Sequence, residues 1–279
     1  AITGEKGLFF SRILMVCRDL KRRKSPPKEI YISDPDGKNF TQLTNDNTLS
    51  LSPSWVNDGK NVTYTQFVWM GSGKMRKRGV ALKKHNLSTG DRDTISSKDG
   101  MNSGATWSPD GKRMALTLSF AGRPEIYVTN STGGEAEPFS RNLRWQKFNG
   151  GFESTDPMLL FDVEPDWAPD GKQLVFSSAR TGHPMIYVAD VMSRTARRLT
   201  FAGKYNSSPA WSPDGKPIAF AGQDKDHFDI FTMSATGSNL KRLTDAKKAN
   251  GRNSNNESPS WSPDGRHILF TSDRTGNTQ

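Results

Sequence analysis

The sequence predicts an all-β protein, arranged as a six-bladed β-propeller with four-stranded blades. The first observation is a short phrase, such as SPAWSPDGK at 208–216, that recurs five times along the chain. The second is that its tryptophans lie 52, 60, 44 and 50 residues apart, which is close to the length of a propeller blade. The third is the turn content, with 25 glycines and 16 prolines in 279 residues. The five tryptophans are Trp55, Trp107, Trp167, Trp211 and Trp261.

Each repeat has the same internal order, which predicts four strands. The tryptophan strand comes first, and its turn leads to an apolar run, as in 114–120, 173–178 and 217–222. A third strand follows at 125–130, 185–190 and 229–234, and a closing strand ends each unit, as at 197–200 and 241–244. We expect a single propeller domain over residues 1–279. Its units are 7–44, 52–96, 104–140, 164–200, 208–244 and 257–279.

The two terminal units differ from the others. The first lacks a tryptophan strand, and the last contains only a tryptophan strand and its partner. We therefore expect the closing strands to be incomplete at the C-terminus.

The repeated phrase is interpreted as scaffold rather than as a catalytic motif. Ser-Pro-Asp-Gly fits a type I turn, because proline presets φ at the second position and glycine tolerates the left-handed region at the fourth. A catalytic residue rarely recurs in every blade, so we expect the aspartates to brace their own turns. These are Asp58, Asp110, Asp170, Asp214 and Asp264.

Composition excludes several classes of protein. No run of about 18 apolar residues is present, so no membrane span is expected. The first residues, 1–7, do not read as a signal peptide. A single cysteine, Cys17, excludes an internal disulfide and a cysteine-rich metal site. The net charge of +10 favours acidic partners or surfaces.

Nothing in the sequence selects an active site. The four histidines are scattered over four units without metal-binding spacing, and no Gly-x-Ser-x-Gly elbow occurs. We therefore expect no catalytic residues, no bound metal and no cofactor. A cation in a propeller channel is compatible with the sequence but is not indicated by it.

The loops before the tryptophan strands are the candidate partner site. Propeller geometry places them on one face, opposite the Ser-Pro-Asp-Gly turns, and their small or polar residues suit a channel mouth that receives a peptide or a partner's loops. The alternative is that they are plain linkers between blades. The candidates three and four residues before a tryptophan are Ser52, Gly104, Val163, Glu164, Ser207, Ser208, Glu257 and Ser258.

Two of these candidates, Glu164 and Glu257, are carboxylates in a basic protein. They are expected to hold a cation or a basic group of the partner, or else to accept hydrogen bonds from their own loops. In the first case, replacing both with Gln weakens binding and leaves the melting temperature nearly unchanged.

Two basic runs form a second candidate surface on the same face. The segments 18–28 and 69–79 each join the second and third strands of a unit. The alternative for both is a solvated loop. The basic residues are Lys21, Arg22, Arg23, Lys24, Lys74, Arg76, Lys77 and Arg78.

The chain resembles the propeller of the TolB family over nearly its whole length. The segments ITGEKGLFFSRILMV (2–16) and SPSWSPDGRHILFTSDRTGN (258–277) are the most specific. The resemblance implies a TolB-type propeller and a non-enzymatic periplasmic protein of the Tol–Pal system. It also implies that a Pal-like peptidoglycan-associated lipoprotein binds at the channel mouth, as do colicin-type peptides that mimic it. By tryptophan register, the family's contact positions fall on Met101, Gly104 and Val163, where the family commonly has His, Ala and Thr.

The chain departs from the family pattern in two places. The family's N-terminal α/β domain, which contacts TolA, is absent from these 279 residues, so a TolA contact is not expected. Residues 141–164 form a longer stretch than the family usually places between blades.

Two other functions remain open. The chain could be the propeller of a prolyl-peptidase-like hydrolase, separated from its catalytic domain. It could also be a propeller that binds through its basic surface, although a nucleic-acid partner is not expected, because Trp69 is the only obvious stacking platform in the basic loops.

Overall fold

The computed structural model describes residues 11–18, 27–145, 160–245, 247, 251 and 253–275. These residues form β-strands joined by turns, with two 3-10 helices, Gly73–Met75 and Ser140–Asn142. The chain divides into two compact units, Ala1–Glu137 and Pro138–Gln279, which are described separately.

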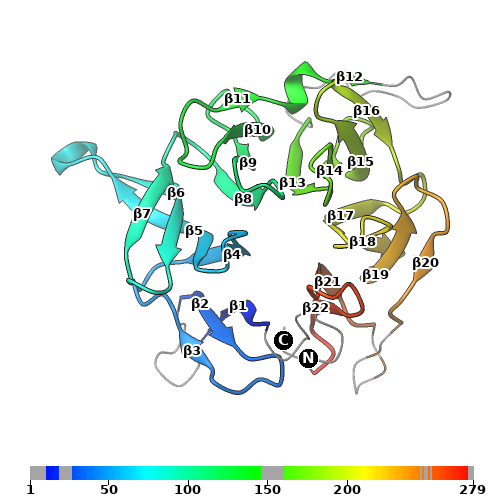
Figure 1. Ribbon diagram of the computed structural model, residues 1–279, viewed down its shortest axis with the longest axis horizontal. Coiled ribbons are helices and arrows are strands. Elements are labelled where there is room, and N and C mark those ends of the chain that lie inside the picture. The colour runs from blue at the N-terminus through cyan, green and yellow to red at the C-terminus, as the bar shows by residue number, and fades with distance from the viewer. Residues whose placement is uncertain are drawn as a thin grey trace. The chain divides into compact units, whose positions relative to one another are not determined.

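The first unit contains three antiparallel sheets that follow one another along the chain (Figure 1). The first sheet has three strands and the others have four, each in sequence order. The strands are β1 (Ile13–Cys17), β2 (Glu29–Ser33) and β3 (Thr41–Gln42); β4 (Ser50–Trp55), β5 (Asn61–Met70), β6 (Lys77–Asn86) and β7 (Arg92–Ser96); and β8 (Asn102–Trp107), β9 (Arg113–Leu118), β10 (Glu125–Asn130) and β11 (Glu137–Pro138).

The second unit contains sheets of five, four and two strands. The five-stranded sheet gains its extra strand from β12, which pairs in parallel with β16. The strands are β12 (Arg144–Trp145), β13 (Asp162–Trp167), β14 (Gln173–Ser178), β15 (Met185–Asp190) and β16 (Thr195–Arg198); β17 (Tyr205–Trp211), β18 (Pro217–Asp224), β19 (His227–Ser234) and β20 (Lys241–Arg242); and β21 (Asn256–Trp261) and β22 (Ile268–Ser272).

The predicted order of four strands is confirmed in the repeats that begin at β4, β8, β13 and β17. Strands β10, β14 and β15 have the predicted bounds, because each is an apolar run that ends at a turn. The six-blade count is not confirmed, since five sheets have at least three strands and the sixth is a two-stranded hairpin. Of the long segment 141–164, residues 141–145 contribute β12 and the end of a 3-10 helix, and 146–159 lie outside the described residues.

The Ser-Pro-Asp-Gly phrase forms the expected turn. In the turn after β17, Gly215 N–H donates to the Ser212 carbonyl at 2.9 Å, and Gly215 has φ +75°. One oxygen of Asp214 accepts hydrogen bonds from the Ser212 hydroxyl at 2.9 Å and the Lys216 amide at 3.0 Å. These bonds lower the pKa of Asp214, the backbone bond from Lys216 first. The aspartate therefore braces its own turn, as the sequence predicts.

The tryptophans pack between successive sheets. In the second unit, Trp211 on β17 is buried in one cluster with Val175 and Ile186 of the preceding sheet. Its backbone amide also donates to Asp166 on β13 at 2.7 Å. In the first unit, Trp107 on β8 packs with Leu82 of the preceding sheet in the same way. In each unit, one large flat tryptophan side chain thus joins neighbouring sheets of that unit.

Candidate functional site

Five tryptophan strands contain the same β-bulge, three residues before the tryptophan. In each, the antiparallel register with the next strand shifts by one residue, as between Val163 and Asp166 on β13. The residue at the bulge has a left-handed backbone in every case. These residues are Ser52 (φ +49°), Gly104 (+62°), Glu164 (+57°), Ser208 (+50°) and Ser258 (+53°).

The expectation that these positions lie in loops was therefore wrong. They lie inside β4, β8, β13, β17 and β21, because a bulge absorbs one extra residue while the ladder continues on both sides.

The bulges hold backbone strain at equivalent places. A non-glycine residue in the left-handed region costs roughly 1–2 kcal/mol, and four of the five are not glycine. Each of those four precedes a proline, which restricts the backbone of the residue before it and has no N–H to donate. Strain that recurs at one position in four repeats points to a constraint of architecture or function.

Glu164 joins two neighbouring bulges in the second unit. Its Oε2 atom accepts hydrogen bonds from the Ser208 amide at 2.6 Å and from the Ser177 hydroxyl at 3.0 Å. Its Oε1 atom accepts from the Ser208 hydroxyl at 3.2 Å. The carboxylate on β13 therefore holds the strained residue on β17. Of the two readings for Glu164, the structure favours an internal hydrogen-bond acceptor, but its donors lie on β14 and β17 rather than in its own loop.

Glu257 has a different environment. It is exposed, and no residue in the described part of the chain donates a hydrogen bond to its carboxylate. Partial burial raises its pKa, and the negative charges of Asp273 and Glu164 raise it further. Burial, followed by the charges of Glu164 and Glu257, also raises the pKa of Tyr205, whose ring packs edge-on against Phe228 at 5.6 Å. We call Glu164, Ser208 and Ser258, with Glu257 and Tyr205, the bulge row.

The other predicted partner residues fall into two places. Val163 and Ser207 start the bulges of β13 and β17, so they belong to the strands of the second unit. In the first unit, Met101 immediately precedes β8, where its amide donates to the Ser119 hydroxyl at 2.7 Å. Ser52 and Gly104 lie on β4 and β8 of the same unit.

The basic residues are only partly within the described chain. Lys21, Arg22, Arg23 and Lys24 lie outside the described residues. Lys74 lies in the 3-10 helix Gly73–Met75, and Arg76 follows it. Lys77 and Arg78 begin β6, so the expectation of a loop over the whole of 69–79 was wrong.

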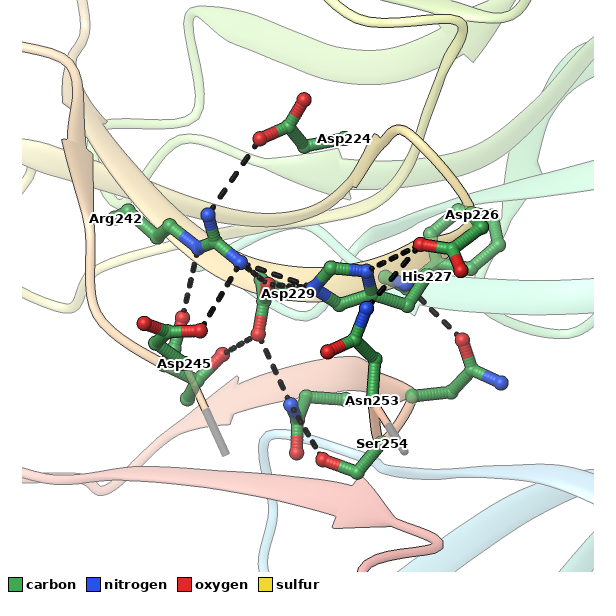
Figure 2. Close-up of polar contacts among 12 residues, drawn as sticks. Asp224, Asp226, His227, Asp229, Arg242, Asp245, Asn253 and Ser254 are labelled. Atoms are coloured by element: carbon green, nitrogen blue, oxygen red, sulfur yellow. Dashed lines mark hydrogen bonds and ion pairs between the residues drawn. The ribbon is translucent and has the colours of Figure 1, made fainter. Parts of the chain in front are cut away.

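Sequence reasoning missed a buried polar network around Asp229, shown in Figure 2. The Asp229 side chain is fully buried at the sheet of β17–β20 and accepts hydrogen bonds from three side chains. The donors are Thr244 Oγ1 at 2.6 Å, Asn256 Nδ2 at 3.0 Å and the Arg242 guanidinium. Figure 2 also shows His227 between two carboxylates, with Nδ1 3.0 Å from Asp226 and Nε2 3.1 Å from Asp229.

The threonine in this network is the usable sequence signal. Thr244 ends the phrase RLT and also accepts a hydrogen bond from the Ile230 amide at 2.9 Å. Thr44 has the same role in the first sheet, where it accepts from the Ile30 amide at 2.9 Å and donates to Glu29. The repeated Leu-Thr pair therefore marks a hydroxyl that binds the backbone of a preceding strand, β2 in the first sheet and β19 in the sheet of β17–β20. This pattern supports a structural role for the network.

The described residues contain neither a metal-binding cluster nor a membrane-spanning helix. Within the described ranges, no group of three or more His, Cys, Asp or Glu residues is placed to hold a metal ion. No helix in that part of the chain is long and apolar enough to cross a membrane.

Comparison with known families identifies the fold. The family model described as the TolB β-propeller domain matches residues 1–252 and 205–279. The chain belongs to the TolB β-propeller family. Its all-β fold is accordingly a β-propeller of TolB type.

Several TolB proteins resemble the chain. It is 36% identical over 118 residues to the Tol-Pal system protein TolB of Alcanivorax borkumensis, covering 42% of this chain and 25% of that protein. It is 37% identical over 179 residues to a TolB homologue of Chlorobium chlorochromatii, covering 64% and 34%. The crystal structure of TolB from Acinetobacter baumannii matches with a TM-score of 0.73 at 28% identity, covering 97% of this chain and 60% of that one. The chain therefore spans a quarter to a third of these two curated relatives.

Proposed function

We propose that the chain is the propeller of a non-enzymatic docking protein of the Tol–Pal envelope system. In this proposal it acts in the periplasm and binds a Pal-like lipoprotein through the bulge row. The Alcanivorax borkumensis relative, named Tol-Pal system protein TolB, supports the system, and the geometry of the bulge row supports the site. The docking function requires no catalytic residue and no cofactor.

The environment of Glu257 is the observation that carries the proposed site. Within the described residues, this exposed carboxylate accepts no hydrogen bond, and the negative charges of Asp273 and Glu164 act on it, so it is poorly satisfied in the free protein. A basic or hydrogen-bond-donating segment of a partner would relieve this, because it supplies the missing donors and offsets the charge of Asp273 and Glu164. Colicin-type peptides that carry the same chemistry would compete for the row.

Glu164 has a supporting role in this proposal. Its oxygens are engaged by Ser208 and Ser177, so it fixes the shape of the row rather than contacting the partner. A rigid row lowers the entropic cost of binding, since the partner meets a surface that is already ordered.

The proposal also includes the six-blade architecture. The β21–β22 hairpin carries the bulge and the Ser-Pro-Asp-Gly turn found in the complete repeats. It is accordingly interpreted as the inner half of a sixth blade in a single propeller domain.

Isothermal titration calorimetry against the soluble domain of a Pal-like lipoprotein tests the function. The proposal expects saturable binding that Glu257→Gln weakens by about tenfold, which corresponds to about 1.4 kcal/mol. The matched control is Glu135→Gln, which neutralises an exposed carboxylate of the first unit and should bind as wild type. Absence of binding by the wild-type chain overturns the partner, and equal affinity of Glu257→Gln overturns the site.

A further inference from the structure

The tip of the β5–β6 hairpin combines exposed apolar side chains with a concentration of positive charge. Strands β5 and β6 are ten residues long, whereas the equivalent strands β9 and β10 of the next sheet have six. The burial pattern shows where the excess begins. Residues 62–66 are buried, but Phe67 and Trp69 are exposed. The turn that joins β5 and β6 therefore lies beyond the packed part of its own sheet, at the end of the cyan arm in Figure 1.

The apolar side chains of the tip are exposed to solvent. Trp69 is 55% exposed and Met75 is 84% exposed, and Phe67 is also exposed. Large apolar side chains that gather at one projecting tip mark an interaction site more often than scattered ones do.

The charge of the tip has one sign. No Asp or Glu occurs between Asp58 and Asp91, although seven Lys and Arg residues do. Four of these are at the tip, and only Lys77 forms a described ion pair, with Asp99 at 2.7 Å. The four are Lys74, Arg76, Lys77 and Arg78.

Arginine and tryptophan are already stacked in this tip. Trp69 pairs directly with Arg78 across the hairpin, and the two guanidinium groups of Arg76 and Arg78 lie 4.7 and 5.3 Å from the indole centroid. This arrangement orders both arginines around the indole ring, and their guanidinium groups compete with a nucleic-acid base for stacking on it.

We propose that the β5–β6 tip docks on an anionic phospholipid surface. Tryptophan and methionine then enter the headgroup region, while the arginines and lysines bind the lipid phosphates. Tryptophan favours this interface because its ring is amphipathic, and long basic side chains reach the phosphates while their stems cover apolar surface. Each Lys or Arg near an anionic leaflet contributes about 1 kcal/mol, or roughly a fivefold gain in binding.

Cosedimentation of the chain with lipid vesicles tests the proposal. Vesicles of phosphatidylcholine with about 30 mol % phosphatidylglycerol should bind the wild-type chain, and pure phosphatidylcholine should not. The neutralised tip, Lys74→Gln with Arg76→Gln, Lys77→Gln and Arg78→Gln, should lose at least about fiftyfold in vesicle affinity. Trp69→Ser keeps the charge and should lose roughly tenfold, because the apolar contribution of the ring and its stacking with the two arginines are removed.

A matched variant separates the tip from the net charge of the protein. Lys112, Lys172, Lys204 and Lys216 are exposed lysines in other turns, and replacing all four with Gln removes the same charge. This control should bind vesicles within about twofold of wild type. Thermal unfolding by circular dichroism checks that each variant is folded, and Trp69→Phe, which retains an aromatic ring, replaces Trp69→Ser if that variant is not.

Three results would overturn the proposal. The first is a wild-type chain that does not bind the anionic vesicles. The second is an equal loss in the lysine control, which would make binding a property of net charge. The third is tip-dependent binding to polyglutamate or to a single-stranded oligonucleotide without binding to vesicles, which would assign the tip to another class of macromolecule.

Discussion

Replacing Glu164 tests how the bulge row is held together. Glu164→Ala removes the acceptor for the Ser208 amide and for two hydroxyl groups, those of Ser208 and Ser177. The hydroxyls rotate to water or other acceptors, but the amide is fixed by its strand. A buried donor without an acceptor costs about 1–3 kcal/mol, and hydrogen bonds to a charged group contribute about 1.5–3 kcal/mol. Since Glu164 is partly exposed, we expect a loss of about 2 kcal/mol in the free energy of unfolding.

Three variants separate the hydrogen bonds that Glu164 accepts from the backbone strain at its position. Glu164→Gln keeps one acceptor oxygen and should lose about 1 kcal/mol. Glu164→Gly also removes the acceptor, but it relieves the left-handed strain at φ +57°, so it should be more stable than Glu164→Ala by about 1 kcal/mol. Glu257→Ala, two repeats further along the chain and without a hydrogen-bonded carboxylate, should change stability by less than about 0.5 kcal/mol.

Urea unfolding followed by tryptophan fluorescence measures these differences. Hydrogen exchange at the Ser208 amide provides a local reading, because that amide loses its partner in Glu164→Ala and keeps one in Glu164→Gln. If Glu164→Ala unfolds at the same urea concentration as wild type and the Ser208 amide remains equally protected, the hydrogen bonds to Glu164 do not stabilise the bulge row. The earlier expectation that Gln replacement leaves the melting temperature unchanged then holds for Glu164 as well as Glu257.

Three further predictions concern the scaffold and its pH dependence. Asp214→Ala should lower the free energy of unfolding by about 1 kcal/mol, because the Ser212 and Lys216 donors lose their acceptor. Partner binding measured by calorimetry should stay unchanged. Unchanged stability with abolished binding would contradict the scaffold role of Asp214. Asp229→Ala should lower the free energy of unfolding by about 3 kcal/mol, since Arg242, Thr244 and Asn256 all lose a buried acceptor. The stability of Asp229→Asn should lie between those of Asp229→Ala and wild type. A thermal unfolding scan in which Asp229→Ala is more stable than Asp214→Ala would contradict this. Folding raises the pKa of Glu257, so its ionised form is disfavoured in the folded protein. Glu257→Gln should therefore be at least as stable as wild type at pH 7, and the difference in stability should vanish as the pH falls toward and below the ordinary Glu value of 4.5. A difference in stability that grows on acidification would contradict this.

Local patterns predicted the strands and the turns. The runs 125–130, 173–178 and 185–190 were placed with their correct bounds because apolar residues end at turn residues on both sides. The role of Asp214 also followed from local sequence, since all the atoms of its turn lie within five residues.

The bulges were misplaced because their backbone is unusual for the residues that form them. A serine or glutamate before a proline does not predict a left-handed conformation, so the bulge residue was interpreted as the end of a loop. The recurring x-Pro pair before the tryptophan is the sequence pattern that marks these bulges.

Interactions between sheets were beyond the reach of sequence patterns. Glu164 and Ser208 are 44 residues apart, and Asp229 and Asn256 are 27 apart, so these contacts depend on how neighbouring sheets pack. The β5–β6 tip was taken for a loop because its glycines and basic residues resemble a solvated turn. Pairing of Trp69 with Arg78 and of Met70 with Lys77 instead continues both strands to residues 70 and 77.

Hydrogen exchange with and without a saturating Pal-like lipoprotein tests the partner site most directly. We expect protection of the bulge peptides at 205–211 and 256–261 of the second unit, with no change at the Ser-Pro-Asp-Gly turns at the other end of the same strands, 212–216 and 262–266. Protection confined to those turns, or to the β5–β6 tip, would contradict the claim that the bulge row is the docking surface.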